Sequence, residues 1–207
     1  MKLTGNTIVI TGGTSGIGKE LVQRFLALGN RVVTCGRRKD RLDQMMAGFP
    51  ELSVFTCDVT NEAERKGFAE WVSANHPAAN VFINNAGIQL FMDFTRSVDL
   101  GRVRTEVETN FIAPVHFISL FAPILAKNAG AAIVNISSGL AFSPLAFMPV
   151  YCATKAAVDS ELGRERWSKG QSSHGGMPVA EFVEAMLRAL EADRFEAAIG
   201  QAEGMKA

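Results

Sequence analysis

The sequence has little cysteine, no excess of either charge and no long uninterrupted hydrophobic run. Its three cysteines, Cys35, Cys57 and Cys152, lie far apart without CxxC spacing, which argues against a disulfide-rich scaffold and fits a reducing compartment. Basic and acidic residues number 21 each, so no overall basic field is available for nucleic acid. The longest mostly apolar run, residues 111–126, contains two prolines and a histidine and is shorter than a membrane span.

The start of the chain and its composition favour a cytoplasmic protein of one domain. Residues 1–11, MKLTGNTIVIT, lead directly into a strand pattern and lack the apolar core of a signal peptide. The chain has 207 residues, of which 47% are hydrophobic, so a single domain with a sizeable core is expected over residues 1–207. We expect neither a membrane nor a nucleic acid among its partners.

Strand-like and helix-like patterns alternate along the chain. Short apolar runs predict strands at residues 7–11, 31–36, 52–59, 80–87, 131–139 and 195–200. Helical spacing predicts helices at residues 18–29, 61–76, 98–127, 149–166 and 179–192, the third of them bent before Pro114. Apolar strands that alternate with helices are typical of a parallel sheet covered on both faces. The predicted fold class is therefore α/β, a three-layer, doubly wound parallel sheet of the Rossmann type.

A glycine-rich turn follows the first predicted strand, in IVITGGTSGIGKE at residues 8–20. At the end of a parallel strand, such a turn lets backbone N–H groups approach a phosphate, and the next helix adds partial positive charge. The spacing, Gly12-x3-Gly16-x-Gly18, departs from the common G-x-G-x-x-G pattern. The phosphate loop of nucleotide triphosphatases fits poorly, because Glu20 replaces its hydroxyl residue. A turn that binds nothing is the other alternative.

Polar residues follow two later strands and extend into a helix. The fourth predicted strand ends in NNAG at residues 84–87, and the fifth ends in Ser137 and Ser138. Tyr151 and Lys155 are four residues apart, on one face of a predicted helix. Because an ammonium group favours a phenolate, we expect Lys155 to lower the pKa of Tyr151. With a serine hydroxyl, this set suits proton transfer in carbonyl/alcohol redox chemistry, with hydride from a nicotinamide. Taken singly, each residue also fits ordinary packing or a solvated face.

Together these motifs resemble those of the short-chain dehydrogenase/reductase family. The resemblance spans residues 1 to about 158 and is carried by TGGTSGIG (11–18), NNAG (84–87), ISS (136–138) and YCATK (151–155). Within the family, the segment PVAEFVEAMLRALE resembles the DltE-like oxidoreductases. The resemblance implies an NAD(P)-dependent enzyme that interconverts a carbonyl and an alcohol of a small molecule by hydride transfer. It also implies a homodimer.

The resemblance further implies a role for each matching position. Tyr151 would be the acid/base, Lys155 would bind the nicotinamide ribose and tune Tyr151, and Ser138 would orient the carbonyl. Asn110 would be the structural and proton-relay asparagine of the catalytic set, whereas Ser137 fits the spacing less well. The cofactor-binding positions would be Gly12, Thr14, Ser15, Gly16, Ile17, Gly18, Asp58, Val59, Asn85, Ala86 and Gly87, together with Tyr151 and Lys155. No metal site is expected, because the histidines lack ligand spacing.

The end of the second predicted strand bears on the choice of cofactor. An acidic residue there would bind the ribose 2′-hydroxyl of NAD and repel the 2′-phosphate of NADP. The chain instead has Gly36 followed by Arg37, Arg38 and Lys39. Because guanidinium groups suit phosphate, we predict NADP rather than NAD, with Arg37 and Arg38 among the cofactor-binding residues. A solvated loop is the alternative for this run of charge.

The family pattern breaks after Lys155. Members normally add a sixth strand that ends in a Pro-Gly or Pro-Pro turn beside the nicotinamide, and no such strand is recognisable between Lys155 and Met177. Residues 163–178 read as an irregular, substrate-loop-like segment, so we expect a deletion, with the strand at 195–200 able to pair with the fifth. Such a loss would remove one wall of the nicotinamide half of the site. The alternative function is therefore a catalytically impaired nucleotide-binding or scaffold protein derived from a reductase.

Overall fold

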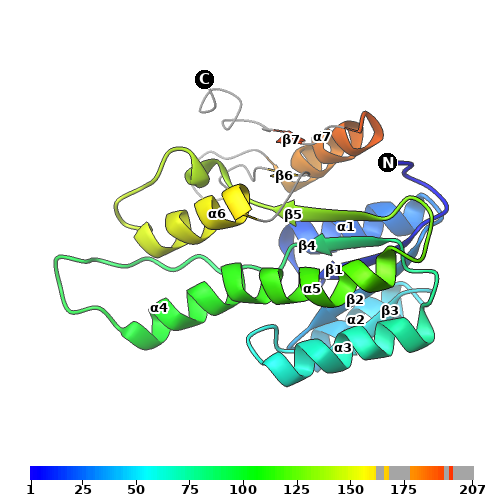
Figure 1. The fold of residues 1–207 in the computed structure, drawn as a ribbon, viewed down its shortest axis with the longest axis horizontal. Helices are drawn as coiled ribbons and strands as arrows, with labels where there is room; N and C mark the ends of the chain where they lie inside the picture. Colours follow the sequence, from blue (N-terminus) through cyan, green and yellow to red (C-terminus); the bar gives the residue numbers. More distant parts are fainter. Residues whose placement is uncertain (162–165, 168–177, 194–195, 198–207) are drawn as a thin grey trace.

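Strands and helices alternate along the chain and build a parallel sheet with helices on both faces (Figure 1). The computed structural model describes residues 1–161, 166–167, 178–193 and 196–197. In these ranges the strands are β1 (Thr7–Thr11), β2 (Arg31–Gly36), β3 (Ser53–Thr56), β4 (Val81–Asn84), β5 (Ala132–Ile136), β6 (Arg166–Trp167) and β7 (Glu196–Ala197). The helices are α1 (Gly16–Ala27), α2 (Lys39–Gly48), α3 (Glu62–Asn75), α4 (Leu100–Val107), α5 (Ala113–Leu125), α6 (Pro149–Glu161) and α7 (Val179–Glu191). Two further helical turns are η1, a π-helical turn at Glu108–Ile112, and η2, a 3-10 turn at Gly139–Ala141.

The strand order across the sheet is β3-β2-β1-β4-β5-β6-β7, and every neighbouring pair is parallel. The chain runs from β1 outward to β3 on one side and then crosses to β4 on the other side of β1. Doubly wound folds bind ligands at such a reversal, beyond the carboxyl ends of the strands. The fold class predicted from the sequence is confirmed, and the candidate site is expected where β1 and β4 end.

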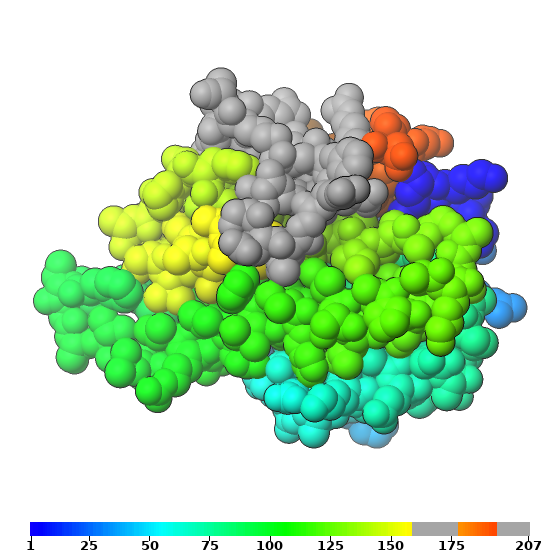
Figure 2. Space-filling view, in the orientation of Figure 1, coloured from blue at the N-terminus to red at the C-terminus, as the bar shows by residue number. Residues whose placement is uncertain are grey.

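A long helix, predicted over residues 98–127, carries part of the site. It consists of α4, η1 and α5 and runs without a break from Leu100 to Leu125. The π-helical turn lies directly before Pro114, close to the predicted bend, because proline has no N–H with which to continue the α-helical bonding. The α4 end of this helix projects from the body of the molecule, with α6 lying against it (Figure 2).

By length and composition alone, the helix from Leu100 to Leu125 could cross a membrane. Core helices of soluble proteins pass the same test, and this one buries Phe117, Phe121 and Leu125 against the sheet. Packing therefore accounts for the apolar character of its α5 half. That the protein has no membrane partner stays a prediction.

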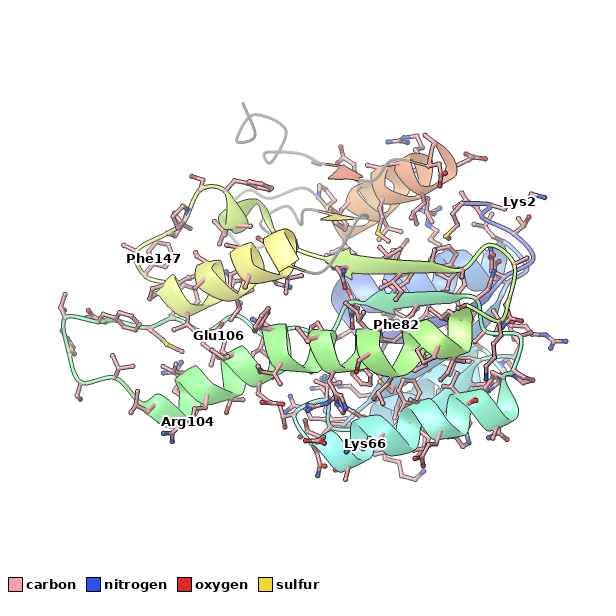
Figure 3. The ribbon with its side chains drawn as sticks, viewed as in Figure 1. Lys2, Lys66, Phe82, Arg104, Glu106 and Phe147 are labelled. Atoms are coloured by element: carbon pink, nitrogen blue, oxygen red, sulfur yellow. The ribbon has the colours of Figure 1, made fainter. Side chains whose placement is uncertain are left out.

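Apolar side chains of the central strands alternate between two cores. In β1, Ile8 and Ile10 pack on one face of the sheet, and Val9 packs on the other. Residues of α1 and α7 complete the first core, and residues of α3 and α5 complete the second. In the second core, Phe82 of β4 stacks on Phe121 of α5 with ring centres 4.3 Å apart, and Figure 3 shows Phe82 between β4 and α5. Both cores hold the ends of β1 and β4 rigidly.

Two elements differ from the predictions. The sequence pattern does not predict α2, because only Leu42 and Met45 of this polar helix are buried. The second difference lies within the segment predicted to be irregular, where Arg166–Trp167 forms a two-residue strand that pairs with β5. β7 pairs with this strand, so the prediction that the last strand pairs with β5 is wrong. Most of residues 163–178 lie outside the described residues.

Candidate active site

The glycine turn joins β1 to α1 and lines a cavity of about 320 Å³. Gly12 has φ of +71°, a conformation that side-chain-bearing residues rarely adopt, and its N–H donates to the carbonyl of Cys35 at 3.0 Å. α1 begins at Gly16, so the first N–H groups of this helix have no partner within the helix. Gly16, Ile17 and Gly18 all line the cavity, which places this partially positive helix end at its wall.

Close approach of the backbone explains two other glycines of the turn. A Cβ atom on Gly18 would lie 2.3 Å from the carbonyl oxygen of Gly12 and 2.4 Å from Nδ2 of Asn85. A Cβ atom on Gly13 would lie 2.2 Å from Oγ1 of Thr34. The turn is therefore packed on its inner side and has no room for side chains there.

Hydrogen bonds tie the end of β4 to the end of β1. Nδ2 of Asn85 donates to the carbonyl oxygens of Thr11 and Gly12, at 2.9 and 3.3 Å. In return, Oγ1 of Thr11 accepts from the backbone N–H groups of Asn85 and Ala86, at 3.1 and 3.0 Å. These bonds cross the point where the strand order reverses, so they hold the glycine turn in place.

Every predicted cofactor position outside α6 lines this cavity. These positions are Gly12, Thr14, Ser15, Gly16, Ile17, Gly18, Arg37, Arg38, Asp58, Val59, Asn85, Ala86 and Gly87. The sequence analysis missed five lining residues: Cys35, Gly36, Cys57, Ile88 and Thr109. All but Cys35 directly adjoin a predicted site residue, so a rule that included the chain neighbours of each predicted site residue would have found these four.

The two cysteines of the cavity wall, Cys35 and Cys57, are fully buried. A hydrogen bond with Cys57 and complete burial raise the pKa of the Cys35 thiol well above its usual range. A thiol is nucleophilic mainly as its thiolate, so a raised pKa keeps Cys35 inert. Both cysteines are therefore part of the packing behind the cavity.

Two arginines stand where β2 ends. Arg37 and Arg38 line the cavity, and Nη1 of Arg37 lies 3.9 Å from Oδ2 of Asp58. Asp58 itself accepts from both the N–H and the hydroxyl of Thr60, at 3.0 and 2.8 Å. The side chain of Arg37 is 61% exposed, so its guanidinium is held loosely and can turn toward an anion in the cavity.

A second cavity, of about 130 Å³, holds the predicted catalytic pair. It is lined by Asn85, Gly87, Ile88, Gln89, Ile136, Tyr151 and Lys155. Because Asn85, Gly87 and Ile88 line both cavities, the two adjoin. Nζ of Lys155 donates to the carbonyl of Ile136 at 2.8 Å and lies 5.8 Å from the centre of the Tyr151 ring.

The pKa of Tyr151 differs from the sequence-based expectation. Burial raises it to about 12, while a hydrogen bond with Ser138 acts in the opposite direction. The expected lowering by Lys155 is therefore wrong here, because desolvation of the phenolate outweighs any attraction from the ammonium. Glu106 and Cys152 raise the pKa of Tyr151 further through their charges. The neutral phenol is thus the stable form.

The two adjacent serines have different surroundings. Ser138 bonds to Tyr151, and its Oγ also accepts from the N–H of Leu140 at 3.2 Å. Ser137 is fully buried and donates to the carbonyl of Lys155 at 3.0 Å. Only Ser138 therefore stands beside the phenol, at the position that the family resemblance indicates.

Asn110 lies in the π-helical turn and connects three elements. Its Oδ1 accepts from the N–H of Ile88 at 2.9 Å, and its Nδ2 donates to the carbonyl of the same residue at 2.8 Å. Nδ2 also lies 3.3 Å from Oγ1 of Thr154 on α6. Asn110 thus fixes the backbone after β4, while its role in proton relay stays a prediction.

In the described part of the chain, no group of three or more histidine, cysteine, aspartate or glutamate residues is arranged to hold a metal ion. The profile of the short chain dehydrogenase family matches residues 6–162, which include every predicted site residue. The chain belongs to the short-chain dehydrogenase family. It is therefore an oxidoreductase by descent, from a family whose members use a nicotinamide cofactor.

Relatives of this short-chain dehydrogenase differ in how much of their length it spans. It is 39% identical to the uncharacterized oxidoreductase DltE of Bacillus subtilis (strain 168), over 100% of this chain and 92% of that protein. That alignment spans 233 positions against the 207 residues here, so at least 26 positions have no counterpart in this chain, as a deletion requires. In several plant relatives at 31–32% identity, the match covers only 52–54% of the relative's own length.

Solved structures of the family share this fold. A short chain dehydrogenase from Burkholderia cenocepacia J2315 in complex with NADP superposes with a TM-score of 0.88 at 26% identity, over 100% of this chain and 93% of that one. A family member from Burkholderia phymatum in complex with NAD gives a TM-score of 0.84 at 20% identity, over 96% and 90%. Because its identity to this chain is only 20%, the Burkholderia phymatum structure supports the fold assignment alone.

The glycine turn of this short-chain dehydrogenase fits a dinucleotide pyrophosphate. At Gly16, φ is +54° and no atom lies within 4 Å of the place where a side chain would begin. A phosphate can therefore approach the backbone N–H groups at the start of α1 without displacing protein atoms. Arg37 and Arg38 add positive charge to the wall of the same cavity.

Proposed function

We propose that this chain is an NADP(H)-dependent oxidoreductase that interconverts a carbonyl and an alcohol of a small molecule. The proposal is carried by the junction of the two cavities: the one lined by the glycine turn adjoins, through shared lining residues, the one that holds Tyr151 and Lys155. The nicotinamide, when bound, would supply the hydride to the carbonyl carbon. A single nucleotide-binding domain over residues 1–207 is part of the same proposal.

Each catalytic side chain then has a definite task. In the direction of reduction, the phenol of Tyr151 donates a proton to the carbonyl oxygen, and its raised pKa keeps this proton in place at neutral pH. Ser138, hydrogen-bonded to that phenol, donates to the same oxygen and orients it. Lys155 and Asn110 hold the ends of the cavity through the carbonyls of Ile136 and Ile88.

The test is binding and turnover by the full chain. NADPH is titrated against the protein and followed by nicotinamide fluorescence, and aldehydes and ketones are then screened for NADPH oxidation. Binding with turnover supports the proposal. Binding without turnover on any carbonyl or alcohol would instead support the alternative, a catalytically impaired nucleotide-binding protein. Absence of binding would contradict both.

Cofactor preference is expected to depend on the two arginines. Replacing both Arg37 and Arg38 with alanine should weaken NADPH binding by about 10- to 100-fold, the loss expected for one charge-assisted bond to the 2′-phosphate, which contributes about 1.5–3 kcal/mol. NADH binding should change little, because it lacks the 2′-phosphate. Lys39→Ala is the matched control, since Lys39 is paired with Asp43 at 2.9 Å and does not line the cavity. Equal losses for NADPH and NADH would contradict the prediction.

We also propose that the enzyme is a cytoplasmic homodimer. The three cysteines are unpaired, as in a reducing compartment. On the long helix, Ile112 and Val115 are 40% and 39% exposed, so apolar surface is available for a second copy. Sedimentation velocity should show a dimer for the wild type and a monomer for Ile112→Glu with Val115→Glu. A monomeric wild type would contradict the proposal.

A further inference from the structure

We propose that Glu106 is a positioning residue of the catalytic cavity, which fixes the segment after β4 together with Asn110 and acts by charge on Tyr151. Figure 3 shows Glu106 on α4, on the side that faces α6. Its side chain is fully buried, although it is a carboxylate. The inference rests on the proposed function for what the cavity does, but not for the contacts described below.

Glu106 and Asn110 hold the same stretch of backbone at two points. Oε1 of Glu106 accepts from the N–H of Leu90 at 2.8 Å, and Oδ1 of Asn110 accepts from the N–H of Ile88 at 2.9 Å. The two side chains are four residues apart and therefore lie on one side of the helix. Gln89 lies between the two fixed N–H groups. It lines the catalytic cavity together with Tyr151 and Lys155. The pair thus sets where Gln89 stands relative to the phenol.

The burial of Glu106 would be hard to explain by packing alone. Its Oε2 is buried and has no hydrogen-bond partner in the part of the chain that the structure describes. Burial raises the pKa of Glu106, while the N–H of Leu90 and the charge of Arg102 lower it. A methionine or leucine would fill the same space without desolvating a carboxylate. Buried titratable groups of this kind gather at functional sites.

α4 packs against α6, so the carboxylate of Glu106 faces the helix that carries Tyr151. The charged and titratable groups acting on this pair are Arg102 on α4, together with Tyr151, Cys152 and Lys155 on α6. A negative charge disfavours a phenolate, and the carboxylate of Glu106 accordingly raises the pKa of Tyr151. Burial is the main cause of the raised pKa of Tyr151, and the charge of Glu106 adds to it in the same direction, toward the protonated form that donates to a carbonyl oxygen.

Three substitutions separate the two parts of this role. Glu106→Gln keeps an acceptor for the N–H of Leu90 and removes the charge. Glu106→Asp keeps the charge, but it is one methylene too short for the bond to Leu90. Glu106→Met removes both. Gln89→Ala serves as the control for the cavity wall, because it leaves the charge and the backbone bonds in place.

The chain has a single tyrosine, so the ultraviolet absorbance of tyrosinate reports on Tyr151 alone. We expect Glu106→Gln and Glu106→Met to titrate at lower pH than the wild type, whereas Glu106→Asp and Gln89→Ala titrate as the wild type does. Circular dichroism at each pH confines the comparison to folded protein. In the pH profile of kcat/KM for reduction, the alkaline limb should move to lower pH in the same two variants.

Substrate affinity tests the positioning part. Glu106→Asp, Glu106→Met and Gln89→Ala should raise KM by about tenfold, as expected for about 1.4 kcal/mol of lost binding, while Glu106→Gln stays close to the wild type. NADPH affinity should stay constant throughout, because Glu106 does not line the nucleotide cavity. The proposal would be overturned if Tyr151 titrated at the same pH in Glu106→Gln as in the wild type. It would also be overturned if Glu106→Gln and Glu106→Asp had equal KM values. The titration needs neither cofactor nor substrate, so it decides the inference even if the wild type shows no turnover.

Discussion

Replacing Tyr151 with phenylalanine is expected to lower kcat for carbonyl reduction by about 10²- to 10⁴-fold, the usual contribution of a positioned general acid. The substitution removes one hydroxyl and keeps the ring, which packs with Leu140 and Met148. Water cannot readily replace the lost proton donor, because the side chain of Tyr151 is buried. NADPH should bind with nearly unchanged affinity, since the nucleotide cavity does not include this residue.

The measurement compares steady-state kcat and the NADPH dissociation constant for the wild type and Tyr151→Phe. Ser137→Ala is the matched control, because Ser137 bonds to the carbonyl of Lys155 and stands outside both cavities. Its kcat should fall far less than that of Tyr151→Phe. If Tyr151→Phe kept more than about a fifth of the wild-type kcat, another group would have to supply the proton, and the proposed chemistry would be wrong.

Gly18→Ala is expected to abolish NADPH binding at concentrations that saturate the wild type. Its Cβ would lie 2.3 Å from a backbone carbonyl oxygen of Gly12, which cannot give way as the end of a flexible side chain could. It would also displace Nδ2 of Asn85, which bonds to Thr11 and Gly12. Overpacking of this kind costs about 1–3 kcal/mol of stability, and the glycine turn must shift away from the cavity to relieve it.

Titration with NADPH and thermal unfolding measure the two effects of Gly18→Ala. Gly67→Ala is a suitable control, because Gly67 lies inside α3 with no atom within 4 Å of a new Cβ. That control should bind NADPH like the wild type and gain about 0.5–1 kcal/mol of stability from helix propensity. Unchanged affinity in Gly18→Ala would show that the turn does not hold the cofactor.

The polar ends of the strands made most of the site predictable from the sequence. Strand propensity locates β1 and β4, and parallel strands end at one edge of the sheet, which is where Gly12 and Asn85, both assigned to the cofactor by the family resemblance, lie. Helical spacing likewise placed Tyr151 and Lys155 on one face of α6. The sign of the Tyr151 pKa shift was not predictable in this way, because burial depends on the whole fold rather than on a neighbour four residues away.

Glu106 and Gln89 could not be found from the sequence. The stretch RTEVETN carries two glutamates at alternate positions, a pattern that reads as a solvated helix face. Only the packing of α4 against α6 shows that Glu106 is fully buried, whereas Glu108 is partly exposed and pairs with Arg65 at 2.8 Å. The two-residue β6 also escapes prediction, since so short a strand has no recognisable period.

The π-helical turn at Glu108–Ile112 separates two demands on one long helix. The rotation of α5 is set by Phe117 and Phe121, which must face the sheet, and the rotation of α4 is set by Glu106, which must face Leu90. In an uninterrupted α-helix, each residue fixes the next at about 100°, so one requirement would dictate the other. The wider turn takes up one additional residue and so offsets the rotation of α4 from that of α5 by a fixed angle. This offset lets Phe117 and Phe121 face the sheet while Glu106 faces Leu90, so an α-helical turn in its place would satisfy only one of the two halves.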